Sequence, residues 1–152
     1  MRIPRASSRG SVNKDGWEIT ADPYVISYGE RLLFIDLGIT QSNAFDRVQG
    51  LFIGAERYSS RIAVEIKDFR SRSPIADLEQ AIGQYVLYRL LLNKVDPERE
   101  IYLAVTVETY NDILSEPIGK VVISDLPLKL IIVDTTRAEV DRWIPPQRTE
   151  RS

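Results

Sequence analysis

The chain of 152 residues contains no histidine and no cysteine. This absence excludes nucleophilic catalysis that depends on imidazole or thiolate, and it excludes zinc sites built from Cys and His. The remaining chemistry belongs to carboxylate, lysine, tyrosine and hydroxyl groups. Side-chain ligands for a metal must therefore be oxygens, which select hard cations such as Mg²⁺, Mn²⁺ or Ca²⁺.

Long apolar runs are also missing. No segment reaches the roughly 20 residues needed to cross a bilayer, and the start, MRIPRASSRG, has no apolar core of a secretory signal. Together with the lack of cysteine, this predicts a cytoplasmic protein that does not associate with a membrane. The hydrophobic fraction of 43% and the charged fraction of 28% are typical of a folded globular protein.

Periodic patterns are confined to the middle of the chain. Residues 1–15 are rich in Ser, Arg and Gly and are predicted to form a poorly ordered lead-in. Residues 145–152 contain two prolines and no large apolar side chain, and they are predicted to form a disordered tail. Residues 16–144 contain no linker composition, so a single domain is expected there.

The order of the patterned segments predicts the fold class. Strand patterns occur at 17–20, 24–29, 32–38, 61–67, 101–105, 129–134 and 138–144. A long helix is predicted at 77–93, with Ser73 and Pro74 as its start signal, and a short helix at 109–114 that Pro117 closes. A three-stranded meander followed by a helical crossover predicts an α/β, or α+β-like, fold with a mixed central β-sheet flanked by helices.

Charged side chains occur where two of these strands end. Asp36 follows the apolar run LLFI, and in RIAVEIK the side chains of Glu65 and Lys67 are predicted to share one strand face. Two carboxylates at one sheet end, with a backbone carbonyl such as that of Ile66, can hold Mg²⁺. A metal-bound water would then attack phosphorus, and Lys67 would orient it or add positive charge.

Each of these residues also has an ordinary structural interpretation. Glu65 and Lys67 alternate as charges on a solvated strand face would, and Asp36 resembles a turn residue at a strand end. Gln84 and Tyr88 lie four positions apart on the predicted helix, where surface and core-edge residues also occur. The combination and order of these residues favour the interpretation as a site.

The same blocks resemble a known family. KDGWEITADPY, LLFIDLG, RIAVEIKDF, DLEQAIGQYVLYRLLL and IYLAV are similar to successive blocks of the XisH family of element excision controlling factors, over about 14–144. The resemblance implies a restriction-endonuclease-like PD-(D/E)XK core, with Asp36 as motif aspartate and Glu65 and Lys67 as the (D/E)-x-K pair. It implies that Gln84 and Tyr88 form a Q-x-x-x-Y helix that positions DNA.

The resemblance also implies functions and partners. The first expectation is an endonuclease, dependent on Mg²⁺ or Mn²⁺, that acts on DNA in site-specific excision, with an XisI-like protein as companion. The second is a non-catalytic regulatory subunit that binds an XisI-like partner or a recombinase. The third is a nuclease toxin held inactive by its partner, and self-association into a homo-oligomer stays open.

Two segments depart from the family pattern. The family usually opens with an amphipathic helix, whereas ASSRGSVN has no apolar stripe. The spacing between Asp36 and Glu65 is also longer than usual, so the stretch from Thr40 to Ser60 is interpreted as an insertion.

Overall fold

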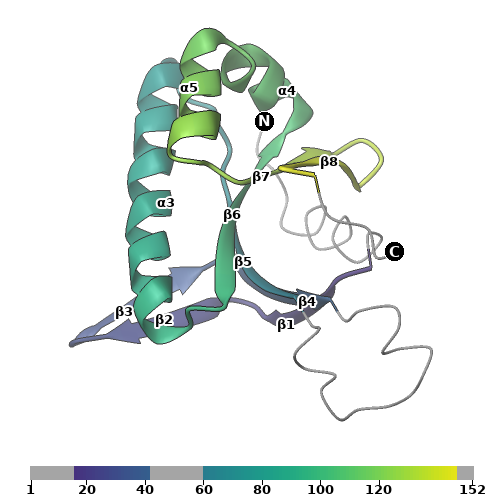
Figure 1. The fold of residues 1–152 in the computed structure, drawn as a ribbon. Coiled ribbons are helices and arrows are strands. Elements are labelled where there is room, and N and C mark those ends of the chain that lie inside the picture. Colours follow the sequence, from purple (N-terminus) through teal and green to yellow (C-terminus); the bar gives the residue numbers. More distant parts are fainter. Residues whose placement is uncertain (1–15, 42–59, 147–152) are drawn as a thin grey trace.

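The fold is described by a computed structural model for residues 16–41 and 60–146 (Figure 1). The predicted lead-in, nearly all of the predicted tail and the interior of the predicted insertion lie outside the described residues. Among the described residues, no helix combines the length and the apolar character that spanning a membrane requires.

The described elements follow one another in this order: β1 (Glu18–Ala21), β2 (Tyr24–Tyr28), β3 (Arg31–Ile35), β4 (Leu37–Gln41), β5 (Ser60–Ile66), α3 (Pro74–Val95), β6 (Arg99–Thr106), α4 (Val107–Thr109), the π-helical turn η2 (Tyr110–Leu114), α5 (Pro117–Asp125), β7 (Leu130–Asp134) and β8 (Glu139–Ile144). The predicted mixed sheet flanked by helices is confirmed.

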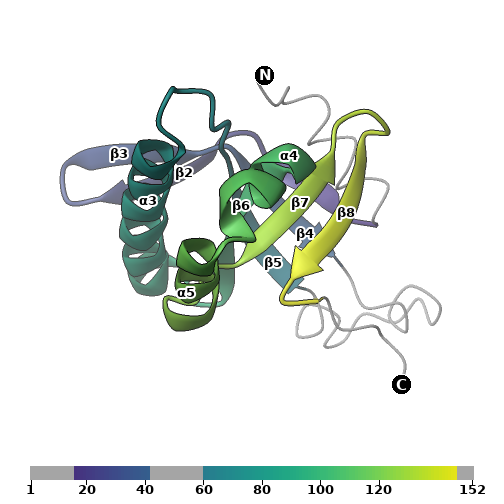
Figure 2. The same cartoon turned by 90° about the horizontal axis from the view of Figure 1, so that it is seen from above.

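Six of the described strands form the main sheet, in the order β1-β4-β5-β6-β7-β8. β5, β6 and β7 are parallel, and the other neighbours are antiparallel. Parallel neighbours need a crossover, which α3 provides between β5 and β6 and α4, η2 and α5 provide between β6 and β7. Figures 1 and 2 show α3 and α5 on the same side of this sheet.

The predicted three-stranded meander is wrong, because β1 pairs with β4 while β2 and β3 form a hairpin of their own. The segment LLFIDLG is likewise not one buried strand. Ile35 belongs to the core under the helices and Leu37 to the core on the opposite side of the sheet. Residues two apart in one strand share a face, so the chain must break between them, and it does so at Asp36.

The β2–β3 hairpin extends from the main sheet and lies against α3 (Figure 2). Its two-residue turn begins at Gly29, whose φ of +62° suits a residue without a Cβ. Ile26 and Ile35 are fully buried on the inner face, whereas Leu32 and Phe34 are 61% and 55% exposed on the outer face. The apolar run therefore does not indicate a strand covered on both sides.

Pro117 does not close a helix, contrary to the prediction. It is the first residue of α5, where its fixed φ suits a helix and its missing N–H costs no hydrogen bond. The short helix predicted at 109–114 exists as α4 and η2, which end before it.

Two apolar cores lie on the two sides of the sheet. The core under the helices includes Leu78, Tyr85 and Leu92 of α3. The opposite core contains no residue of the described helices; Trp17 and Trp143 lie there with ring centroids 5.5 Å apart. The strands between these cores are buried on both faces, as expected for parallel strands.

Asp96 joins several elements at the end of α3. Its carboxylate accepts hydrogen bonds from the Tyr24 hydroxyl and from Arg99 Nε, both at 3.0 Å, and pairs with Arg61 at 3.2 Å. Burial raises the pKa of Asp96, but the hydrogen bonds from Arg99 and Tyr24 and the nearby positive charges outweigh burial and lower it overall. This carboxylate therefore ties β2, α3, β5 and β6 together.

We expect Asp96→Ala to lower the free energy of unfolding by about 2–3 kcal/mol, because it leaves Arg99 and Tyr24 without their shared acceptor. Urea denaturation followed by tryptophan fluorescence measures the change. Glu98→Ala is the matched control, since the Glu98 side chain is 85% exposed and also pairs with Arg61. Equal losses in the two variants would contradict the structural role assigned to Asp96.

Candidate active site

Asp36 lies where the chain passes from the β2–β3 hairpin into the main sheet. Its Oδ2 accepts a hydrogen bond from the backbone N–H of Ile66 at 2.8 Å. The break between β3 and β4 thus directs the Asp36 carboxylate toward the end of β5. The sequence placed Asp36 at a strand end, and the structure adds the contact to β5.

Side chains of β5 alternate between the two cores. Ile62 and Val64 lie in the core away from the helices, and Ala63 lies in the core under them. Glu65 shares the face of Ala63, so the predicted alternation is confirmed. This face is not solvated, because Glu65 is only 8% exposed.

Helix α3 supplies a tyrosine near Glu65. Ser73 begins the helix by accepting a hydrogen bond from the Ala76 N–H, and this start brings Tyr88 onto the inner face, where it is 8% exposed. The pKa of Tyr88 is raised, first by burial and then by the negative charges of Glu65 and Asp36. Tyr88 therefore lies close to both carboxylates, which the sequence did not establish.

The electrostatics of Glu65 are unusual for a glutamate. Burial is the largest effect and, with the neighbouring charge of Asp36, raises the pKa of Glu65 to about 7, against the lowering effects of Lys67 and of a hydrogen bond from the Asp36 backbone. Glu65 Oε1 is buried and has no hydrogen-bond partner among the described residues. This carboxyl group therefore holds its proton to a higher pH than an exposed glutamate does.

Lys67 completes the group at the end of β5. Its ammonium nitrogen lies 3.5 Å from Glu65 Oε2, and its side chain is 23% exposed. Its backbone N–H donates to the Ala104 carbonyl at 3.0 Å, which extends the ladder with β6 by one residue. Asp36, Glu65, Lys67 and Tyr88 are hereafter called the Asp36–Glu65 site.

Gln84 lies one helical turn before Tyr88 on α3. Its Oε1 is buried and, within the described residues, has no hydrogen-bond partner. None of the hydrogen bonds of the described part of the chain joins Gln84 to the two carboxylates. The structure therefore places Tyr88 near the two carboxylates and gives no contact between Gln84 and them among the described residues.

The donor set of this site fits a hard cation. Asp36 and Glu65 lie together, and Glu65 Oε1 has no hydrogen bond to lose on metal binding. No group of three or more acidic side chains with metal-site geometry occurs at 16–41 and 60–146, but Mg²⁺ often uses only one or two carboxylates and keeps its waters. The Ile66 carbonyl points to the same side as the Ile66 N–H, toward Asp36, because both groups of a strand residue do.

One acidic neighbour was not singled out from the sequence. Asp68 directly follows Lys67, its side chain is 17% exposed, and Arg70 pairs with it at 3.4 Å. Its position in the run EIKD was the available signal. Asp68 therefore resembles Glu65 in two respects, since each carboxylate has an ion pair and a buried oxygen without a hydrogen bond among the described residues.

Comparisons with known proteins agree on one family. The family model described as XisH protein matches residues 5–141. Two crystal structures are similar, each with a TM-score of 0.75, 29% identity, and coverage of 93% of this chain and 98% of the other. One is an fdxN element excision controlling factor protein from Anabaena variabilis, and the other an XisH family protein from Nostoc punctiforme. No curated protein matches.

The raised pKa of Glu65 predicts how stability depends on pH. The unfolded chain ionises Glu65 near 4.5, whereas the folded chain does so near 7. The contribution of Glu65 to the free energy of unfolding therefore falls as the pH rises from about 4.5 to about 7, and it does not fall further above that range. Since one unit corresponds to about 1.4 kcal/mol, we expect Glu65→Gln to stabilise the metal-free chain by about 1–3 kcal/mol at pH 8.

Urea denaturation in chelator at a series of pH values measures this difference. The difference in the free energy of unfolding between the two chains should shrink as the pH falls, because Glu65 is then protonated in both the folded and the unfolded state. A Glu65→Gln variant that is less stable than the unsubstituted chain at every pH would contradict the interpretation.

Proposed function

This chain belongs to the XisH family, and we propose that it hydrolyses phosphodiester bonds of DNA, with Mg²⁺ bound at the Asp36–Glu65 site, in the excision of a DNA element. The observation that carries the proposal is the buried Glu65 carboxylate, with its pKa raised to about 7 beside Asp36 and an Oε1 that lacks a hydrogen bond. Perturbed, buried carboxylates of this kind cluster at functional sites. The name of the relative from Anabaena variabilis, an excision controlling factor, supports the DNA-excision part of the proposal.

The proposed site corresponds to a PD-(D/E)XK arrangement. Asp36 and Glu65, with the Ile66 carbonyl, would bind the metal. Mg²⁺, when bound, supplies a water of lowered pKa and positive charge at the phosphate. The oxygen of such a water would form a bond to phosphorus as the ester P–O bond breaks, and the proton that the water gives up to solvent would balance the one that the leaving oxygen takes from solvent.

The other residues act around this step. The ammonium of Lys67, which lies 3.5 Å from Glu65 Oε2, orients the attacking water and adds charge where the phosphate develops it. Tyr88 and Gln84 lie on α3, where a hydroxyl and an amide position the DNA strand. Arg70 and Arg72 are exposed just after β5, and they supply phosphate contacts.

A specific observation favours a second candidate function, that of a regulatory subunit for an XisI-like partner. On the outer face of the β2–β3 hairpin, Val25, Leu32 and Phe34 are 47%, 61% and 55% exposed. Val25 and Phe34 are paired across the strands, so these apolar side chains form one surface. Apolar surfaces of this kind mark protein-interaction sites.

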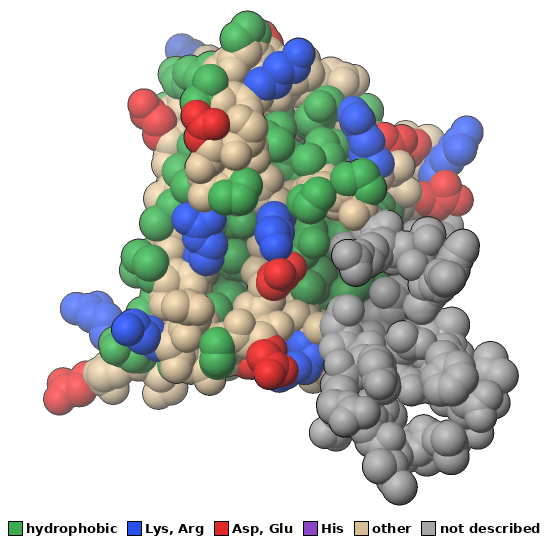
Figure 3. Space-filling view, in the orientation of Figure 1, with side chains coloured by type: hydrophobic (Ala, Val, Ile, Leu, Met, Phe, Trp, Pro, Cys, Tyr) green, Lys and Arg blue, Asp and Glu red, His purple; other side chains and the backbone are tan. Residues whose placement is uncertain are grey.

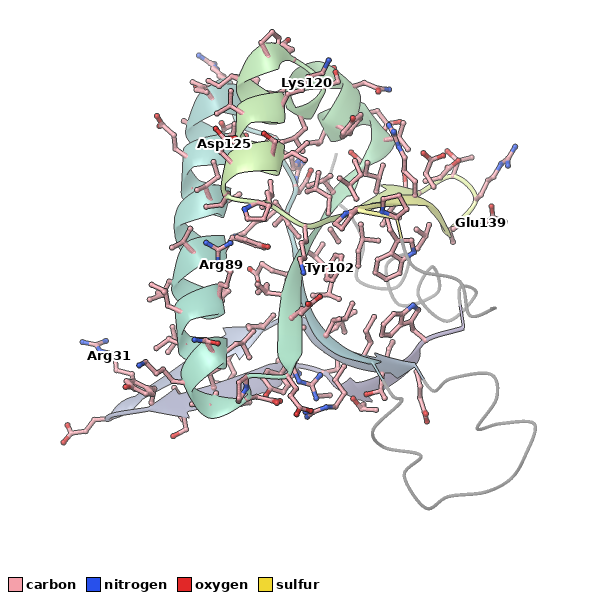
Figure 4. All side chains as sticks on the ribbon, viewed as in Figure 1. Arg31, Arg89, Tyr102, Lys120, Asp125 and Glu139 are labelled. Atoms are coloured by element: carbon pink, nitrogen blue, oxygen red, sulfur yellow. The ribbon has the colours of Figure 1, made fainter. Side chains whose placement is uncertain are left out.

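For the first function, we expect Glu65→Gln and Lys67→Met to abolish Mg²⁺-dependent cleavage of a DNA fragment without loss of folding. Glu139→Gln is the matched control, because Glu139, labelled in Figure 4, is exposed and lies on β8, which β6 and β7 separate from β5 in the sheet. A gel assay measures cleavage, and calorimetry measures Mg²⁺ binding. An unsubstituted, folded chain that neither binds Mg²⁺ nor cleaves any DNA would contradict the proposal.

For the second function, we expect the double substitution Leu32→Ser and Phe34→Ser to abolish a complex with an XisI-like protein. The control is Val121→Ser on α5, where the side chain is 56% exposed on another surface. Size-exclusion chromatography of the mixed proteins measures complex formation. A complex that survives the double substitution would assign the interface elsewhere.

A further inference from the structure

A cavity lies away from the Asp36–Glu65 site. It has a volume of about 420 Å³ and opens between α3 and the segments that lead into β6 and β7. Among its lining residues are Tyr85, Arg89, Asn93, Glu100 and Lys129. The pairing of β5 with β6 aligns Arg61 with Arg99, so the cavity lies at the opposite end of the parallel strands from Lys67.

Arg89 is held in place at this cavity. Its NH1 donates to the backbone carbonyls of Leu126 at 3.1 Å and Pro127 at 3.4 Å, and its guanidinium lies 5.6 Å from the centre of the Tyr85 ring. The side chain points from α3 toward β6 (Figure 4). Arg89 forms no ion pair with a carboxylate of the described segments, so a positioned guanidinium fork retains donors for a ligand.

Lys129 adds a second positive charge. Its ammonium lies 2.9 Å from Glu100 Oε1, and Glu100 is 55% exposed at its side chain. The Lys129 backbone is fixed, because its N–H donates to the buried Tyr85 hydroxyl at 3.1 Å. Figure 3 shows basic side chains on this face beside α3, with hydrophobic side chains between them.

The walls between the charges are apolar. Leu90, which is 59% exposed, and the exposed Pro127 are part of the lining, together with the buried Ile101. Arg89, Arg99 and Lys129 line the cavity with Glu100 as its one carboxylate, and Arg99 pairs with Asp96 outside the lining, so the lining has an excess of positive charge. A volume of about 420 Å³ lies within the usual range of small-molecule sites.

We propose that this cavity binds a small organic anion, whose carboxylate or phosphate group is held by Arg89 and Lys129 and whose planar or apolar body lies against Leu90 and Pro127. A guanidinium can donate two parallel hydrogen bonds to a carboxylate or a phosphate group. A neutral ligand would not accept this charge-assisted pair of bonds. Glu100 turns into solvent when the anion takes its place on Lys129. This site is independent of Mg²⁺ and of DNA cleavage.

The test uses benzoate and benzamide as a matched pair with the same planar body, and inorganic phosphate as an anion without a body. Each is titrated into the full metal-free chain at constant ionic strength, with backbone amide shifts followed by NMR. We expect saturable shifts at Arg89, Ile101 and Lys129, with benzoate binding at least about tenfold more tightly than benzamide. If phosphate also binds there, the anionic group dominates the affinity; if only benzoate binds, the body contributes as well.

Variants separate this site from general anion binding. Arg89→Gln should weaken benzoate about tenfold or more, whereas Arg31→Gln at the distant tip of the β2–β3 hairpin should leave binding unchanged. Asn93→Asp adds a negative charge at an exposed lining position without removing an internal hydrogen bond, so it keeps the test valid if Arg89→Gln unfolds. The proposal would be overturned by equal affinity for benzoate and benzamide or by no saturation below about 50 mM. It would also be overturned if Arg31→Gln weakened benzoate binding as much as Arg89→Gln does.

Discussion

The burial of the Glu65 carboxyl group beside Asp36 is the constraint on which the candidate site depends. A carboxylate removed from water loses hydration, and a second negative charge nearby adds repulsion. The fold offsets part of this cost with Lys67, which pairs with Glu65 at 3.5 Å, and with the Ile66 N–H, which donates to Asp36 at 2.8 Å. The part of this cost that is not offset raises the pKa of Glu65, so additional positive charge would stabilise its ionised form. A bound cation would supply that charge, so the burial of Glu65 favours the proposed metal binding.

Helix α3 contributes residues to both sites. The negative charges of Glu65 and Asp36 act on Tyr88, and Tyr85, one turn earlier, accepts a hydrogen bond from the Lys129 N–H and makes a ring contact with Arg89 at the cavity. Its length of 22 residues is set by the Ser73 cap at one end and by Asp96 at the other. The same helix thus contributes Tyr88 near the Asp36–Glu65 site and one wall of the anion cavity. The two sites lie at opposite ends of β5 and β6.

Local patterns in the sequence were sufficient for β5 and α3. The alternation in RIAVEIK placed Glu65 and Lys67 correctly on one face, and Ser73 with Pro74 marked the helix start. What failed depended on contacts distant in sequence. The run LLFIDLG does not say that Ile35 and Leu37 join different cores, and Pro117 ends one helix or begins another with the same ring geometry. The proximity of Tyr88 to Asp36 likewise depends on how α3 crosses the sheet, which periodicity does not encode.

The central claim is that Glu65 is a buried, electrostatically strained carboxyl group poised to bind a cation. A ¹³C NMR titration of the Glu65 side-chain carboxyl, with and without Mg²⁺, tests it most directly. We expect a pKa of about 7 in the metal-free chain and a clear fall when Mg²⁺ is added. A pKa near 4.5 without metal, unchanged by Mg²⁺, would contradict it.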